Sequence, residues 1–509
     1  MIARRLGHSV VLLERGKHPR VVIGESSTPL SNLLLEDLAT RYDLPALKPL
    51  AKWGSWQRSY PRVACGLKRG FTFYHHVLGR ADECDSDRRN QFLVAASPHD
   101  QVADTHWFRA DVDEMLVRQA EGLGVDYVDE IKLERAFDWG DGLSLEGTKN
   151  GVDVAFRAGF VVDATGPRGF LHRALRLREA ALPGYPATQA LYSHFSGVKR
   201  LAEIDRRPLV EAPPYPVDDA AVHHVFDGGW IWVLRFDNGI TSAGVAATER
   251  SAAGLGLLRG EKAWDDLLTL IPALGEQFRT ARAERPFTHM ERVSFMSDVL
   301  GGHKWAMLPS AAGFVDPLLS TGFPLTLLGV SRLAEIFEQD WRSPRFGQRL
   351  ERYTAQTRDE LLATARLVAS LYANMNNFPV FRSLSLLYFA AASFSETARR
   401  LNKPQLAPSF LLHDHPTFGP ALRNLLDRAE RVRTEQESAR FSEDILRAIE
   451  PIDVVGLSNL GRRNWYPVDP EDLLRSHLKV EASREEIVSL LDRCGFTSSE
   501  LRGGPMACS

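Results

Sequence analysis

The first residues that could do chemistry lie at the end of a short apolar run near the start of the chain. Residues 9–13 read Ser-Val-Val-Leu-Leu, follow Gly7 and end at Glu14. Such a run predicts a buried parallel strand, and residues 1–6 predict the last turns of a helix. A helix end, a glycine, a strand and an acid form the second half of a dinucleotide-binding βαβ unit, in which the acid accepts hydrogen bonds from ribose hydroxyls. We therefore predict that Glu14 contacts a nucleotide; the alternative is an ordinary surface glutamate.

The first half of such a unit, a strand and a Gly-rich turn, does not stand ahead of residues 1–14. In a complete unit these parts occupy roughly 20–25 residues before and within the helix whose N-terminus bears the pyrophosphate. Two explanations fit this pattern: a start placed too far downstream, so that the sequence is N-terminally truncated, or a degenerate nucleotide-binding domain. We favour the misplaced start.

Composition excludes several classes of protein. The 509 residues include 62 basic and 65 acidic residues, a net charge of −3, which argues against a nucleic-acid binder that works through clustered positive charge. With 44% hydrophobic and 25% charged residues, the chain matches a folded globular protein rather than a disordered one. No stretch predicts a membrane span or a signal peptide, so we expect a cytoplasmic protein.

Cysteine and histidine spacing indicates neither a metal centre nor a disulfide framework. The four cysteines are scattered and are expected to be free thiols: Cys65, Cys84, Cys494 and Cys508. The adjacent pairs His75-His76 and His223-His224 lie in strand-like runs, where neighbouring side chains point to opposite faces. Neither pair alone predicts a metal site.

Four separated segments carry the most specific pattern in the sequence. They are the strand up to Glu14 with Pro19-Arg20 and Gly24-Glu25-Ser26; Arg109 before an amphipathic helix at 111–122; Asp163-Ala164-Thr165-Gly166; and the run from Ala311 to Gly322. In this order they resemble the superfamily of flavin-dependent halogenases and FAD-dependent monooxygenases of the tryptophan-halogenase kind. The likeness covers residues 1 to about 340 and is loose beyond them.

The resemblance implies an α/β fold. It comprises a parallel-sheet, Rossmann-like FAD-binding domain, a mixed β substrate domain and a helical C-terminal region. We expect residues 1–185 to form the first part of the FAD-binding domain, with a strand insertion at about 60–107. The other expected parts are 186–295 (β-rich substrate domain), 296–340 (last part of the FAD-binding domain) and 341–509 (helical region). Local patterns add strand hairpins over 125–162, turning at Gly140-Asp141-Gly142, and a helix near 322–338.

FAD is the cofactor that the resemblance implies, and it places the contacts on the four segments. The expected cofactor-binding residues are Glu14, Arg20, Glu25, Ser26, Arg109, Asp163, Gly166, Ser310, Gly313, Asp316, Pro317 and Gly322. A Gly-rich turn at a helix start aims unpaired N–H groups at an anion, the part assigned to Gly313 and Gly322. Ser310 replaces an aspartate usual in the family, which removes a charge.

Alternative structural roles exist for several of these residues. Asp316-Pro317 also predicts a helix start, with Asp as the cap and Pro in the first position. Asp163 to Gly166 also fits a strand-ending turn, and Arg109 a solvated arginine at a helix start.

Lys68 is the catalytic residue that the resemblance implies. Halogenases of the family use reduced flavin and oxygen to oxidise chloride, and pass hypochlorous acid to a lysine beside the substrate. Such a lysine needs a partly buried strand position, where desolvation keeps the amine reactive. Lys68 precedes the strand-like run at Phe71 and resembles that position, although most single lysines are solvated.

Two further features bear on the substrate. Trp230 and Trp232 resemble the halogenase Trp-x-Trp signature, but packing inside a sheet explains the pair slightly better. Tryptophan halogenases carry a glutamate where this chain has Leu319, which disfavours free tryptophan as the substrate.

We therefore expect an FAD-dependent oxidoreductase that acts with reduced flavin and oxygen on an aromatic or carrier-tethered substrate. Expected partners are a separate flavin reductase and, for a halogenase, chloride. Halogenation and hydroxylation stay unresolved at this point. The alternatives are a flavin-dependent reductase of the geranylgeranyl-reductase kind and a degenerate, non-catalytic binding protein.

Overall fold

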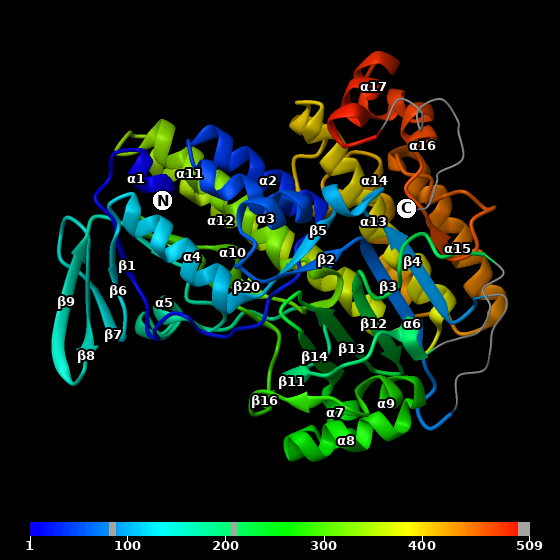
Figure 1. Ribbon diagram of the computed structural model, residues 1–509. Helices are drawn as coiled ribbons and strands as arrows, with labels where there is room; N and C mark the ends of the chain where they lie inside the picture. The colour runs from blue at the N-terminus through cyan, green and yellow to red at the C-terminus, as the bar shows by residue number, and fades with distance from the viewer. Residues whose placement is uncertain (81–87, 205–210, 497–509) are drawn as a thin grey trace.

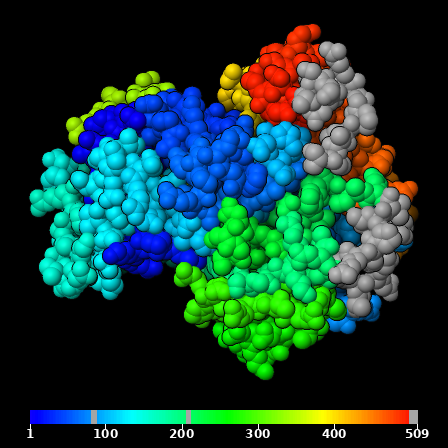
Figure 2. Space-filling view, in the orientation of Figure 1, coloured from blue at the N-terminus to red at the C-terminus, as the bar shows by residue number. Residues whose placement is uncertain are grey.

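A computed structural model describes residues 1–80, 88–204 and 211–496. The chain forms an α/β protein in which two regions of sheet lie side by side and long helices cover the far end (Figure 1). The surface view shows the N-terminal half in blue and cyan against the green sheet lobe, with the orange and red C-terminal helices above (Figure 2). The expected α/β class is confirmed.

The first region of sheet is divided into two parts, each built on a parallel strand pair, and an antiparallel strand extends one of them. In one part, β1 (Val11–Leu13) pairs with β6 (Asp126–Val128). In the other, β10 (Val161–Asp163) pairs in parallel with β19 (Trp305–Met307), and β18 (Gly301–Gly302) extends it. The expected strand at 9–13 is parallel, but its predicted burial is wrong, since Val11 and Leu12 are each 39% exposed. Among the described residues β1 has a partner strand on one edge only, so its other edge is left uncovered.

Both β1 and β10 begin against the same two aromatic rings. The ring of His8 lies 5.8 Å from Phe337 and 5.0 Å from Trp341. The ring of Phe160 lies 5.2 Å from Phe337 and 6.1 Å from Trp341. The two strands therefore start side by side, yet no described strand pairs with both of them, and Val162 on β10 is 44% exposed.

The second region of sheet is continuous and has nine strands in the described part of the chain. Their order is β15 (Arg282–Ala283), β11 (Thr188–Ser196), β14 (Ile240–Thr248), β13 (Gly229–Arg235), β12 (Ala221–Phe226), β3 (Gly70–His75), β4 (Gln91–Ala95) and β21 (Trp465–Tyr466), with β16 (Thr288–Met290) also on β11. The strand insertion expected at about 60–107 thus supplies β3 and β4 to this sheet, and the C-terminal region supplies β21.

Helices cover both faces of the nine-stranded sheet. On one face lie α7 (Glu249–Leu255), α8 (Glu261–Leu270) and α9 (Pro272–Phe278), where Trp264 packs on Phe195. On the other face lies α13 (Phe378–Arg400), where Phe381 packs on Phe73. Trp230 and Trp232 are buried on this second face with their rings 5.7 Å apart, so their interpretation as sheet packing is confirmed.

The remaining helices fall into two groups. The lobe that holds the parallel strands β1 and β10 contains α1 (Ile2–Arg5), α2 (Pro29–Arg41), α3 (Trp53–Ser59), α4 (Arg109–Gly122), α5 (Phe170–Ala174), α10 (Pro309–Ala312) and α11 (Gly322–Asp340). The C-terminal end contains α12 (Phe346–Tyr372), α14 (Phe418–Ala429), α15 (Glu435–Ile449), α16 (Pro470–Arg475) and α17 (Arg484–Arg493). The predicted helices at 111–122 and 322–338 are confirmed.

Short strands complete the lobe that holds β1 and β10. The predicted hairpins are confirmed as β7 (Ile131–Asp138), β8 (Leu143–Lys149) and β9 (Val152–Ala158), which project at one side of the molecule (Figure 1). Two further pairs are β2 (Cys65–Lys68) with β5 (Asp104–Trp107), and β17 (Phe295–Met296) with β20 (Gly313–Phe314).

The structure bears on two of the predictions made from composition, those on membrane spans and on cysteines. By length and mean hydropathy, α13 alone among the described helices could cross a membrane, but 78% of that stretch is buried inside the protein, as in a core helix. Cys65 and Cys494 are unpaired thiols, as expected. Cys84 and Cys508 lie outside the described residues.

Candidate functional site

A cluster of two acids and two arginines stands at the carboxyl end of β1. Glu14 accepts a hydrogen bond from the Gly16 N–H (2.7 Å) and lies 3.4 Å from the Arg20 guanidinium. Arg109, at the start of α4, makes paired contacts of 2.7 and 2.9 Å with Asp113, and Arg20 lies 3.9 Å from the same carboxylate. The structure thus brings together Glu14, Arg20 and Arg109, three residues predicted to bind the cofactor.

The loop after this cluster runs toward the nine-stranded sheet. Arg109 donates to the carbonyl of Gly24 (3.0 Å) and so fixes the start of the loop. Glu25 is buried, and its Oε1 lies 2.8 Å from Nε2 of His194 on β11. The next side chain, Ser26, has a buried hydroxyl without a protein partner. Glu25 therefore ties the loop to the second sheet, whereas Ser26 keeps its hydrogen-bonding capacity for another group.

Asp163 stands at the carboxyl end of β10 and holds the turn that follows. Its Oδ1 accepts from the N–H and hydroxyl of Thr165 (2.8 and 2.6 Å), and its Oδ2 accepts from the N–H of Leu171 (2.7 Å). Gly166 has a φ of +82°, and a Cβ there would meet no atom within 4 Å, so the turn is open to one side. Ser310 follows the neighbouring strand β19, where the Leu308 N–H bonds to the Asp163 carbonyl. Asp163, Gly166 and Ser310 therefore share one edge of the divided sheet.

The turn from Gly313 to Gly322 has two dissimilar ends. A Cβ on Gly313 would lie 2.8 Å from a methyl of Leu361 and 3.1 Å from the carbonyl of Phe295, so this end of the turn is closely packed against α12. A Cβ on Gly322 would meet only Phe314, at an ordinary 3.8 Å, and α11 begins there without a side-chain cap. The free N–H groups of a helix start favour an anion or a carbonyl oxygen. Of the two glycines, Gly322 is the one with room for a ligand.

Asp316 faces away from this turn toward two tyrosines. Its Oδ2 accepts hydrogen bonds of 2.9 Å from the hydroxyls of both Tyr185 and Tyr372, and Trp230 donates to Tyr372 (3.1 Å). Burial raises the pKa of Asp316 to about 6, against the opposing effect of these hydrogen bonds. The predicted helix start at Asp316-Pro317 is met only by a 3-10 helix, whose first residue is Leu318 rather than Pro317. Asp316 bonds the N–H of Leu318 within a short 3-10 turn, and α11 begins later, at Gly322.

Lys68 occupies the last position of β2 and has no exposed surface. Its ammonium donates to the carbonyl of Ser27 (2.5 Å) and stands 4.0 Å from the centre of the Phe71 ring. Burial lowers the pKa of Lys68, so the neutral, nucleophilic amine is accessible at a lower pH than in water. Lys68 therefore lies on a strand, as expected, but it is fully rather than partly buried.

The histidines near Lys68 stay uncharged. Burial, and then the charge of Lys68, lowers the pKa of His106 and of His223 to about 3. Neither imidazole therefore competes with the lysine as a cation near neutral pH. His76 and His224, from the two pairs seen in the sequence, lie 2.9 Å apart through their ring nitrogens. In the described part of the chain no group of three or more His, Cys, Asp or Glu side chains has the arrangement of a metal site.

A network of charges fixes the strand end that carries Lys68. The N–H of the next residue, Arg69, donates to the carbonyl of Asp219 (2.6 Å), and its guanidinium binds Asp100 (2.8 Å). Asp219 in turn binds Arg200 (2.5 Å).

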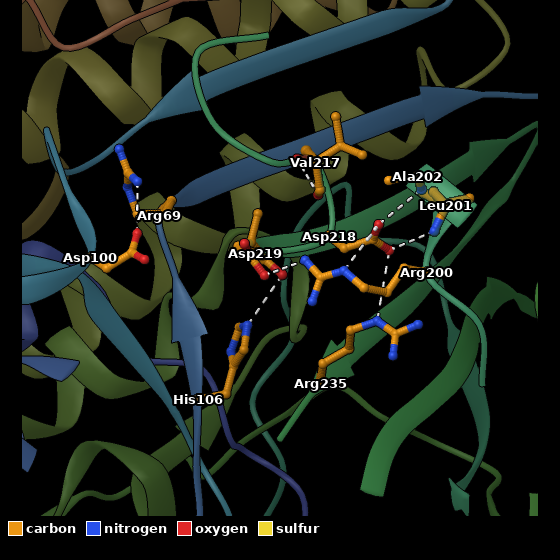
Figure 3. Close-up of polar contacts among 12 residues, drawn as sticks. Arg69, Asp100, His106, Arg200, Leu201, Ala202, Val217, Asp218, Asp219 and Arg235 are labelled. Atoms are coloured by element: carbon orange, nitrogen blue, oxygen red, sulfur yellow. Dashed lines mark hydrogen bonds and ion pairs between the residues drawn. The ribbon is translucent and has the colours of Figure 1, made fainter. Parts of the chain in front are cut away.

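The neighbouring Asp218 is the buried centre of this network. It accepts from the N–H of Leu201 (2.9 Å) and lies 3.7 Å from the guanidinium of Arg235. Figure 3 shows these groups converging from separate elements on Asp218 and Asp219. Because every charge in the network has a partner, its role is to hold β2, β12 and β13 in register.

Asp104 lies directly opposite Lys68 on the neighbouring strand β5. Both side chains are therefore on one face of the strand pair. Asp104 is 5% exposed; Asn32 donates to its Oδ1 (2.7 Å), while its Oδ2 has no partner. Burial raises the pKa of Asp104, and the positive charge of Lys68 opposes that rise.

A cavity of about 190 Å³ adjoins this pair of charges. Its wall includes Asp104 and Asn32 on one side and the aromatic rings of Phe71, Tyr388 and Phe389 on another. The C-terminal region closes the cavity with residues that include Val455, Tyr466, Leu490 and Phe496. This is a concave, mostly apolar site with a few polar groups, the usual form of a small-molecule pocket.

Comparison with known proteins identifies similarity to halogenases. The sequence profile described as tryptophan halogenase matches residues 89–377. Monodechloroaminopyrrolnitrin halogenase PrnC of Pseudomonas fluorescens is 29% identical over 359 residues, covering 69% of this chain and 61% of that protein. Tetracycline 7-halogenase of Kitasatospora aureofaciens is 29% identical over 416 residues, covering 79% of this chain and 72% of that protein. The chain thus matches somewhat less than two thirds of the first of these relatives.

Solved structures share the fold. The structure of halogenase PltM in complex with phloroglucinol and FAD superposes with a TM-score of 0.80 at 24% identity, over 91% of this chain and 95% of that one. The flavin-dependent brominase Bmp2 superposes with a TM-score of 0.58 at 20% identity, over 85% of this chain and 95% of that one.

Proposed function

Because the chain belongs to the tryptophan halogenase family, we propose that it is an FAD-dependent halogenase acting on an aromatic substrate. The observation that supports this function most strongly is the position of Lys68. Its ammonium is fully buried between the carbonyl of Ser27, on the loop leaving the carboxyl end of β1, and the ring of Phe71, which lines the cavity. A lysine in that position separates a place for the cofactor from a place for the substrate.

The residues at the carboxyl ends of the parallel strands fit FAD. Ligands of such sheets bind outside the carboxyl ends of the strands, where Glu14, Asp163 and Ser310 stand. The unpartnered hydroxyl of Ser26 and the uncapped, open helix start at Gly322 supply hydrogen-bond donors for a polar ring edge or a phosphate. These residues, with Arg20 and Arg109, would hold the cofactor. Asp316, Pro317 and Gly313 contribute through the shape of their turn, and Glu25 through its bond to His194.

Bound FAD, once reduced, supplies with oxygen the oxidation of a halide to hypohalous acid. The role of the protein is then to hold the hypohalous acid and to deliver its halogen to the substrate. Lys68 in its ammonium form donates a hydrogen bond to hypohalous acid, and as a neutral amine it attacks the halogen; its lowered pKa makes both forms accessible. The apolar wall around Phe71 excludes water, which limits loss of the oxidant.

We also propose that one more parallel strand fills the space between β1 and β10. Both strands begin at the rings of Phe337 and Trp341, and each turns an uncovered edge with exposed apolar side chains toward that space. The strand and Gly-rich turn predicted ahead of Met1 would fit there, and would bring the phosphate-binding turn to the carboxyl edge.

Flavin titration tests the cofactor site. A chain extended by its upstream in-frame codons is expected to take up FAD with the change in absorbance of a bound flavin. Gly322→Val is expected to abolish uptake without unfolding the protein, since the added carbons project toward the ligand space. The matched control is Gly347→Val, also in the first turn of a helix, where a Cβ has open space. If neither the given chain nor the extended chain takes up FAD, the result favours the non-catalytic alternative.

Two predictions about partners and location accompany this function. Reduced flavin would come from a separate reductase, because the described residues are accounted for by one cofactor region, one sheet lobe and a helical cover. The cytoplasmic location stays a prediction from the sequence; fractionation of the native cells would test it.

A further inference from the structure

Among the described residues that line the cavity near Lys68, two buried side-chain atoms have no hydrogen-bond partner: the Ser97 hydroxyl and Asp104 Oδ2. Of these two atoms only Asp104 Oδ2 belongs to a carboxylate. Asp104 is nearly fully buried, and of its two carboxylate oxygens only Oδ1 is bonded, to the amide of Asn32. Oδ2 has no hydrogen-bond partner, although Asp104 lines the cavity. Leaving a buried carboxylate oxygen unbonded costs about 1–3 kcal/mol, and a function commonly accounts for such an atom.

Two other acids, Asp469 and Glu396, line the same cavity and differ from Asp104 in this respect. Asp469 Oδ1 accepts from the N–H of Glu471 (3.0 Å). Glu396 on α13 also lines the wall, but its Oε1 accepts from Arg400 (2.7 Å). Asn32 thus bonds Asp104, while Arg400 bonds Glu396 and also lies 3.8 Å from Glu36. Among the carboxylates of the described cavity wall, Asp104 Oδ2 is the buried oxygen left for a ligand.

We propose that Asp104 is a further catalytic residue, which binds the ring hydroxyl of a phenolic substrate through Oδ2 and takes up its proton during halogenation. This inference rests on the proposed function and deepens it. It assigns the substrate class, a hydroxylated single-ring aromatic, and the group that activates it.

The size and lining of the cavity agree with that substrate. An apolar cavity of about 150 Å³ holds benzene, so the cavity of about 190 Å³ here has room for a substituted single ring. Phe71 and Phe389, whose rings stand 5.1 Å apart at a steep angle, offer an edge and a face for an aromatic ligand. The same wall includes Asp104 and Asn32, and Asp104, which lies opposite Lys68 on the paired strand, would receive the hydroxyl of the ring.

The proton transfers of the proposed reaction balance between Asp104 and Lys68. The phenol gives its proton to Asp104 Oδ2 while a ring carbon attacks the chlorine of hypochlorous acid held at Lys68. The C–Cl bond forms and the Cl–O bond breaks; the oxygen leaves as water with a proton from the Lys68 ammonium. The ring proton then passes to the Lys68 amine, and Asp104 returns its proton to the ring oxygen. The ring loses two electrons, the chlorine gains them, and the sum is ArH + HOCl → ArCl + H2O.

The protonation behaviour of the pair supports this role. Burial raises the pKa of Asp104 and so makes it a stronger base than an exposed aspartate. The charged or titratable groups that face it are Lys68, Glu396, Arg400 and Tyr388. Lys68 and Arg400 favour the carboxylate form, and Glu396 disfavours it.

Binding without flavin or halide tests the proposal separately from the proposed function. The probes are 4-nitrophenol and its isostere 4-nitrotoluene, which lacks the hydroxyl. The wild-type chain is expected to bind 4-nitrophenol about 10- to 100-fold more tightly, the value of a hydrogen bond to a charged acceptor. Asp104→Asn, which keeps shape and the bond to Asn32, is expected to lose most of that preference, whereas the control Glu396→Gln keeps it.

Two results would overturn the assignment. One is a wild-type protein that binds both probes equally, which needs no variant to be folded. The other is a folded Asp104→Asn protein, judged by its melting curve, that retains the full preference for 4-nitrophenol. A protein that takes up no FAD but shows the preference and loses it in Asp104→Asn would support the Asp104 site while refuting the proposed halogenase.

Discussion

The two regions of sheet differ in how completely they are formed. Around Lys68 the strands β2 and β5 pair with each other, the nine-stranded sheet is continuous, the charges of Asp218 and Asp219 are paired, and Asp104, with its unbonded carboxylate oxygen, lines a cavity. At β1 and β10 the strands have open edges with exposed apolar side chains, although the acids at their carboxyl ends are already bonded. The substrate side is thus preorganised, whereas on the cofactor side the loops are held in place but the described strands β1 and β10 have uncovered edges.

The largest expected effect lies on the preorganised side. Lys68→Met, close in shape to lysine and uncharged, is expected to lower the halogenation rate by about 10²–10⁴-fold, the range for loss of a reacting side chain. FAD uptake is expected to be unchanged, because Lys68 bonds only the backbone of the cofactor loop. Product mass spectrometry and flavin titration measure the two quantities. If Lys68→Met keeps the wild-type halogenation rate, Lys68 does not connect the cofactor region to the substrate region in the reaction.

Asp316 provides a second test, with a defined dependence on pH. Its folded pKa is raised to about 6 from 3.8, so the native state holds this proton more tightly than the unfolded chain does. Its contribution to stability is therefore fully present below about pH 4 and is lost as the pH rises to about 6, a change of about 3 kcal/mol.

Urea unfolding of the wild type and of Asp316→Asn would measure this change. The difference between their free energies of unfolding is expected to vary between pH 4 and pH 6 and to be flat above, since asparagine does not titrate. A constant difference across that range would show that the two tyrosines do not bury an ionisable acid.

The contrast between the sheets predicts unequal costs for the same substitution. Val225→Thr, at a position with no exposed surface on β12, is expected to cost about 1–3 kcal/mol, because a hydroxyl is buried without a partner. Val162→Thr, at a position 44% exposed on β10, is expected to stay within about 0.5 kcal/mol. Equal costs, measured by urea unfolding, would mean that β10 is covered in solution. In a chain extended at its N-terminus the two costs should become similar.

The smallest effect is expected in hydrogen exchange. Amides of β1 and β10 that point toward the uncovered edges should exchange quickly, and those of β13, paired with β12 and β14, slowly. Extension of the chain should slow the first set and leave the second unchanged. Slow exchange at β1 in the given chain would argue that no strand is missing from the space.

Local patterns predicted the elements better than the contacts between them. Helical periodicity indicated α4 and α11, and the run before Phe71 placed Lys68 on a strand. The cluster of Glu14, Arg20 and Arg109 followed from the resemblance. What the sequence could not show was register, because the pairing of Lys68 with Asp104 joins strands far apart in the chain.

The missed residues share that cause. Asp104 lies on a short strand, five residues before the Arg109 that marks the start of the predicted helix, and nothing nearby in the sequence indicates a cavity. Asp316 was read from its neighbour Pro317 as a helix cap, but its distant partners Tyr185 and Tyr372 determine its environment. The burial of β1 was inferred from its apolar letters, whereas burial depends on a neighbouring strand.

The most direct test of the account is the product formed from phloroglucinol by the extended chain with reduced FAD and oxygen, with and without chloride. The account predicts a product in which chlorine replaces a ring hydrogen, formed only when chloride is present and lost in Lys68→Met. A product that has gained an oxygen atom in the absence of chloride, or reduction of a double bond without oxygen, would contradict it.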